Sequence, residues 1–245
     1  MHRRLILLSI IISFCQFSMA QVPVNLSGSI GGGLLVPQSS NLKGDMRSAY
    51  DYPLSKTGYD LNAKIRLGLP ALPFAIIGNV SYNSLSDNAV LPASTPNGLV
   101  NANYTNALSI ISAGVGLEYT MLPTPIIKPY IGANLVVNFI SGSGTWGNNL
   151  NFETKLNSTR RYGVDLGIGT LIETPMLPCS LDLEAQYHLA NLLGKTYSNA
   201  VPGFTGNPLT FESNLDDAKN PYDPKDHDRS INYFTVTLGF RFNII

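Results

Sequence analysis

The sequence has few charged residues. Only 13% of its 245 residues are Asp, Glu, Lys or Arg, whereas soluble domains usually carry about 25%. The charges sum to zero and the basic residues form no run, which removes the electrostatic basis for binding nucleic acid. Because 44% of the residues are hydrophobic and few are charged, we expect part of the protein surface to contact a medium other than water.

Long apolar runs and cysteines are also scarce. After the first 20 residues no stretch holds 18 consecutive apolar residues, which excludes a membrane crossing by helices and leaves only a closed barrel of strands. The two cysteines are Cys15 and Cys179. If Cys15 is removed with a leader, Cys179 stands alone, which excludes an internal disulfide and any multi-cysteine metal site. We expect Cys179 to be a buried small apolar residue.

The N-terminus has the pattern of a signal peptide. A basic start at 2–4 precedes an apolar run at 5–14 and a small-x-small cleavage pattern at 18–20. We therefore expect 1–20 to be a signal peptide and 21–245 to be a single exported domain.

The main positive signal is an alternation of apolar and polar residues with a period of two, which is typical of strands. It predicts eight strands, at about 24–36, 58–69, 74–84, 107–120, 129–140, 161–173, 181–191 and 232–245. The more apolar faces of these runs carry no charged residue. The opposite faces carry ten, namely Asp60, Lys64, Arg66, Glu118, Arg161, Asp165, Glu173, Asp182, Glu184 and Arg241.

Three features indicate that the apolar face points outward, to lipid. Connections expected to be short (70–73, 121–128, 174–180) alternate with long ones (37–57, 85–106, 141–160, 192–231), as in outer-membrane barrels. The short connections are apolar and Pro-rich, which suits a membrane interface better than water. Aromatic residues gather at both ends of the apolar faces, namely Tyr59, Tyr82, Phe139, Tyr162 and Tyr187 at one end and Phe74, Tyr119, Phe240 and Phe242 at the other.

The predicted fold is therefore all-β, an eight-stranded antiparallel transmembrane β-barrel with short periplasmic turns and long extracellular loops, and with both termini on the periplasmic side. The alternative is a secreted soluble barrel of the lipocalin kind. It would need strands of 11 to 14 residues, where about 5 or 6 is usual.

The whole mature sequence resembles the small outer-membrane β-barrel proteins of Gram-negative bacteria, the OmpA/OmpX-type eight-stranded class. The eight two-faced runs and the alternating last strand, 233–245, carry the resemblance. It implies a bacterial outer-membrane location, contact with outer-membrane lipid, and recognition of the last strand by the barrel-assembly machinery. Members of such families mostly end in an aromatic residue, whereas this chain ends in Ile245, three positions after Phe242.

An eight-stranded barrel is just wide enough to be filled by side chains or to hold one small ligand. Inward charges of both signs predict a lumen charge network, because buried charges persist only when they are paired. We expect it to contain Lys64, Arg66, Glu118, Asp165, Glu173, Asp182, Glu184 and Arg241. The alternative use of these charges is a proton or ion path through the lumen.

The sequence offers no convincing site for catalysis, a cofactor or a metal. His188 is expected to be a hydrogen-bonded lumen histidine, and the acidic segment 216–228 lacks the Gly and terminal Glu of a calcium loop. Ser109 and Thr170 are the only hydroxyl residues on the outward faces, and no His accompanies them. We therefore expect a non-enzymatic barrel that displays loops for membrane integrity or for contact with a surface partner. The alternative is a narrow pore or a channel for small hydrophobic solutes, lined in part by Ile77, Leu108, Ile110 and Val136.

Overall fold

The computed structural model describes most of the region expected to form strands. The described residues are 25–38, 56–69, 72–95, 98–121, 126–147, 152–173, 178–194, 204–205, 209–213 and 230–244. Their strands are β1 (Asn25–Pro37), β2 (Gly58–Gly68), β3 (Phe74–Thr95), β4 (Gly98–Thr120), β5 (Ile127–Trp146), β6 (Phe152–Ile172), β7 (Ser180–Leu193), β8 (Phe204–Thr205), β9 (Leu209–Ser213) and β10 (Asn232–Asn243). No helix long and apolar enough to cross a membrane occurs in these ranges.

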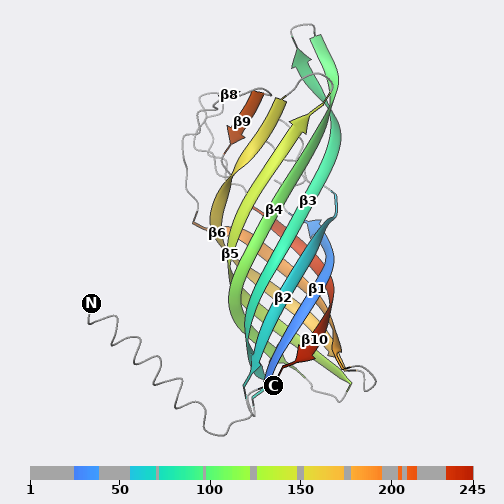
Figure 1. The fold of residues 1–245 in the computed structure, drawn as a ribbon, viewed down its shortest axis with the longest axis vertical. Coiled ribbons are helices and arrows are strands. Elements are labelled where there is room, and N and C mark those ends of the chain that lie inside the picture. The colour runs from blue at the N-terminus through green and yellow to red at the C-terminus, as the bar shows by residue number, and fades with distance from the viewer. Residues whose placement is uncertain are drawn as a thin grey trace, which may run out of the picture.

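Eight of the strands form a closed ring (Figure 1). Each of β1 to β6 pairs antiparallel with the next strand in sequence, and β10 lies between β7 and β1. Closure gives every strand of the ring two neighbours and leaves no open edge, which a lipid-exposed sheet requires. The eight-stranded antiparallel ring predicted from the sequence is confirmed.

The alternation of the sequence becomes an inside and an outside. Outward side chains are apolar and exposed, and Ile30 and Leu135 are each 68% accessible. Their neighbours on the opposite face, including Asp60, Lys64 and Arg66, are buried in the lumen. A soluble barrel would show the reverse distribution. The structure therefore confirms the predicted assignment of faces.

Aromatic side chains lie at both ends of the outward apolar surface. At one end the rings of Tyr59 and Tyr82 have centroids 6.0 Å apart. At the other end Phe74 and Tyr119 are 5.0 Å apart. Two such belts are typical of a barrel that crosses a bilayer, because these residues settle at the lipid–water interfaces.

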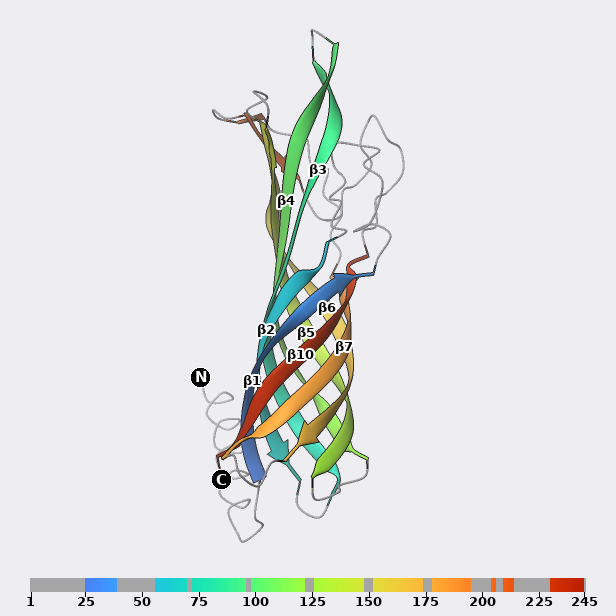
Figure 2. The same cartoon turned by 90° about the vertical axis from the view of Figure 1, so that its right-hand side faces the viewer.

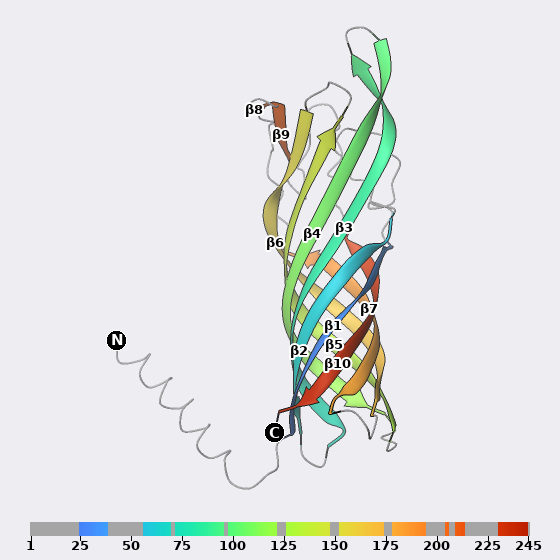
Figure 3. The ribbon, with the colours of Figure 1, turned by 45° about the vertical axis from the view of Figure 1, so that its right-hand side comes forward.

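The prediction that 85–106 and 141–160 are extracellular loops was wrong. Almost all of both segments is strand, because β3 to β6 continue well past the ends of their neighbours (Figures 2 and 3). On the side of β2, pairing with β3 stops at Ser84. We call the continuation the outer sheet and define it as residues 86–95, 98–107, 142–146 and 152–156.

Two short strands widen the outer sheet. β9 pairs parallel with Phe152–Leu156 of β6, and β8 pairs antiparallel with β9. Both belong to the expected loop 192–231. Most of that loop, most of 37–57 and the whole predicted signal peptide lie outside the described residues.

Candidate functional site

Arg66 is the centre of the ion pairs in the lumen, at the end of the barrel nearer the short turns. Its Nε donates to Glu118 Oε2 at 2.8 Å, one terminal nitrogen to Ser29 Oγ at 2.7 Å, and the other to Asp182 Oδ2 at 2.7 Å. All four side chains are buried. One guanidinium thus joins β1, β2, β4 and β7 across the interior.

Further buried contacts extend this group. Lys64 pairs with Glu184, whose other carboxylate oxygen accepts a hydrogen bond from Gln186 at 2.9 Å. The hydroxyl of Tyr130 donates to Asp182 Oδ1 at 2.6 Å. We define the ionic layer as Lys64, Arg66, Glu118, Tyr130, Asp182, Glu184 and Arg241. It places charges of both signs in the lumen together with their partners, as a low-dielectric interior requires.

Tyr130 was missing from the sequence prediction although it lies on an inward face. The guanidinium carbons of Arg66 and Arg241 lie 5.7 Å and 5.8 Å from the centroid of its ring, within the range of cation–π attraction. The ring has room because β6 carries Gly169 beside it, where a Cβ would meet the ring and its hydroxyl. An aromatic residue on an otherwise charged face was the sequence signal that could have identified it.

Two of the predicted network residues have other partners. Asp165 lies 2.9 Å from Nδ1 of His188, and Nε2 of His188 lies 2.9 Å from the hydroxyl of Thr235. The His188 ring also stacks on Tyr233 with centroids 4.4 Å apart. Glu173 pairs with Lys128 at 2.6 Å, and both of these side chains are about one third exposed, at 38% and 32%.

Beyond the polar part of the lumen lies an apolar layer, toward the outer sheet. Its members are buried and in mutual contact, namely Leu35, Leu85, Leu108, Ile110, Ile140, Leu156, Ala190, Ile231 and Tyr233. Leu85, Leu156 and Ile231 fall in segments that the sequence indicated as loops, so this closure of the lumen was not foreseen.

Three features identify the type of barrel: an apolar outward face, an aromatic belt at each end of it, and a lumen filled by side chains. This chain is an eight-stranded β-barrel of the outer-membrane type. No protein-family model matches it, and no curated protein sequence does.

Two solved structures of one protein are similar to it. One is Ail, the attachment invasion locus protein of Yersinia pestis, in complex with the heparin analogue sucrose octasulfate. This match has 13% identity and a TM-score of 0.43, and covers 90% of this chain and 100% of that one. The other is the outer membrane protein Ail of the same organism in a phospholipid bilayer nanodisc, with 14% identity, a TM-score of 0.32 and coverage of 88% and 99%.

In the described part of the barrel, no group of three or more His, Cys, Asp or Glu side chains could hold a metal ion. The acidic segment 216–228 lies outside the described residues. The outward hydroxyl of Ser109 lies 3.3 Å from that of Tyr82. Cys179 is half-buried just before β7, so the expectation of a buried residue was wrong.

Proposed function

We propose that this protein is a bacterial outer-membrane barrel with a lumen filled by its own side chains, and that its outer sheet makes contact with a surface partner. The single observation that carries the proposal is that the lumen holds two successive layers of buried side chains. The ionic layer lies toward the short turns and the apolar layer lies toward the outer sheet. A filled lumen favours display over transport as the barrel's task.

The outer sheet is the part of the barrel suited to such contact. It continues the hydrogen-bonded ladder of β3 to β6 beyond the apolar belt, so it is held by the barrel rather than by a flexible tether. Outward residues there include Ser86, Ser143 and Lys155, which are polar and exposed. Segments carried on a rigid scaffold are where proteins most often place binding residues.

Purified protein in planar bilayers is expected to give no steady conductance above that of the bare bilayer, because the ionic and apolar layers leave no continuous aqueous path. A general porin in the same bilayer serves as the positive control. A stable current that becomes less cation-selective in Glu118→Gln would contradict the filled lumen and favour the narrow pore, since lumen charges tune selectivity only where ions pass.

Shortening the β3–β4 hairpin tests the role of the outer sheet. Replacing residues 89–104 by Asn-Gly joins Asn88 to Thr105, which already pair across the hairpin, through a turn that suits two-residue hairpins. We expect the barrel to fold and cells producing the variant to lose adherence to an epithelial monolayer, down to the level of cells without the protein. The matched control exchanges exposed Ser86 for Thr, which retains the hairpin. Adherence equal to wild type in the shortened variant would refute this role.

A further inference from the structure

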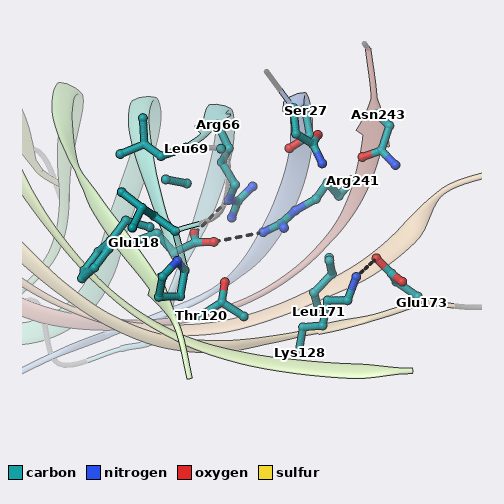
Figure 4. Close-up of a pocket in the computed structure, with 16 residues that line it drawn as sticks. Ser27, Arg66, Leu69, Glu118, Thr120, Lys128, Leu171, Glu173, Arg241 and Asn243 are labelled. Atoms are coloured by element: carbon teal, nitrogen blue, oxygen red, sulfur yellow. Dashed lines mark hydrogen bonds and ion pairs between the residues drawn. The ribbon is translucent and has the colours of Figure 1, made fainter. Parts of the chain in front are cut away.

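A cavity of about 350 Å³ opens at the short-turn end of the barrel, opposite the outer sheet (Figure 4). It is lined by the ends of strands from around the ring and lies against the ionic layer. Three cationic side chains line it, those of Arg66, Lys128 and Arg241, against two anionic ones, those of Glu118 and Glu173. The lining residues carry one more positive than negative charge, and Asp182, just outside the lining, pairs with both arginines.

The two arginines of the cavity differ in how far their donors are used. Arg66 makes three hydrogen bonds of 2.7 to 2.8 Å, through all three of its nitrogens. Arg241 reaches Glu118 and Asp182 only at 3.4 Å and 3.5 Å, both through the same terminal nitrogen. Its Nε is buried and has no hydrogen-bond partner among the described residues. Every nitrogen of Arg66 is therefore hydrogen-bonded, whereas Arg241 makes only long contacts through one terminal nitrogen and retains more donor capacity.

Two uncharged neighbours of Arg241 in the cavity can donate hydrogen bonds to an anion. Ser27 and Asn243, which pair across β1 and β10, line the same side of the cavity as Arg241 and offer a hydroxyl and an amide (Figure 4). Lys128 stands at the other side with its side chain one third exposed. The guanidinium carbon of Arg241 lies 5.8 Å from the centroid of the Tyr130 ring, and this cation–π attraction favours its position beside the cavity.

We propose that this cavity binds a small oxyanion, with Arg241 as its principal donor and Lys128 as its second cation. A guanidinium with unused donors presents the planar fork that fits two oxygens of one phosphate or carboxylate group. Either a free solute or the phosphate of a lipid headgroup supplies this chemistry. The site lies at the other end of the barrel from the outer sheet, so it is independent of the surface contact proposed above.

The experiment is a titration of inorganic phosphate into the protein in phosphatidylcholine nanodiscs, followed by NMR of the arginine Nε–Hε groups. Ionic strength is held constant with sodium chloride. We expect the Arg241 signal to shift and saturate, and Arg66 to shift less because its donors are already bonded. Acetate in a second titration should also shift the Arg241 signal, because its carboxylate offers the same pair of oxygens. Nanodiscs containing phosphatidylglycerol separate the sources, because a headgroup in the site would shift the signal before phosphate is added.

Three variants make the result decisive. Arg241→Gln and Lys128→Gln should each weaken phosphate binding, the first by about tenfold or more, as expected for the loss of a hydrogen bond to a charged group. Because Arg241→Gln lacks the guanidinium signal, its binding is followed at the side-chain amide of Asn243, which lines the same cavity. Lys56→Gln removes one positive charge at the opposite end of the barrel and should leave phosphate binding unchanged. The heat-induced shift in gel mobility verifies folding of each variant. A separate titration with sodium chloride shows the non-specific effect of salt on the Arg241 signal. The proposal is overturned if phosphate shifts this signal linearly, as sodium chloride does, or if Arg241→Gln and Lys128→Gln both bind phosphate like wild type.

Discussion

Replacing Arg66 by alanine is expected to lower the free energy of unfolding of the barrel by about 3–5 kcal/mol, the usual cost of breaking a buried ion pair from one side. The substitution leaves the buried carboxylates of Glu118 and Asp182 with no cation closer than Arg241, at 3.4 Å and 3.5 Å. Urea-induced unfolding in lipid vesicles, read by tryptophan fluorescence and gel mobility, measures the change.

A double-mutant cycle separates pairing from simple loss of packing. Arg66→Ala combined with Glu118→Gln should cost less than the sum of the two single changes, because the second removes a charge that the first left unpaired. Arg66→Ala combined with Asp87→Asn, at the other end of the barrel, should be additive. If the cycle with Glu118 is also additive, the ionic layer does not hold the strands together.

The second large effect is expected on the lipid-facing surface. Val115→Arg should destabilise the barrel by about 2–4 kcal/mol, because it places a charge near the middle of the apolar belt. Val115 is 65% exposed and pairs with Gly78 and Leu135 on the neighbouring strands. Assembly efficiency and urea midpoints in vesicles report the change.

Two matched variants show whether depth in the membrane is the cause. Leu117→Arg lies one outward position nearer the belt residue Tyr119 and should cost less than Val115→Arg. Ser86→Arg introduces the same charge on the outer sheet and should stay within about 0.5 kcal/mol of wild type, as exposed substitutions usually do. Equal stability of all three variants would mean that the outward face does not meet lipid.

The sequence sufficed to assign the faces of the barrel because lipid and lumen impose opposite chemistry on successive residues. Asp60, Lys64 and Arg66 alternate with apolar residues along β2, and the structure buries all three. The partners of these charges could not be predicted, because pairing across a lumen depends on the register and stagger of the whole ring. Arg66 and Asp182, for example, are 116 residues apart.

The outer sheet escaped prediction for a related reason. Segment 86–106 contains Asn, Ser and Thr at positions of both parities, together with Pro92. The inward face of this sheet is buried, but it carries polar as well as apolar residues, among them Asp87, Tyr104 and Asn106. The segment therefore shows no alternation of apolar and polar residues, although the ladder from Ser86↔Ala107 to Thr95↔Gly98 makes it a strand.

The pairing of β1 with β10 has a consequence for how the barrel is made. Eleven residue pairs, from Ser27↔Asn243 to Pro37↔Tyr233, join the two ends of the chain. This seam cannot form until the last strand has been synthesised, and it has the largest sequence separation of any strand pairing in the ring. Contacts of such long range are slow to form. Until the seam closes, β1 and β10 are two open edges prone to pairing with other chains, so the growing chain depends on protection until its final residues arrive.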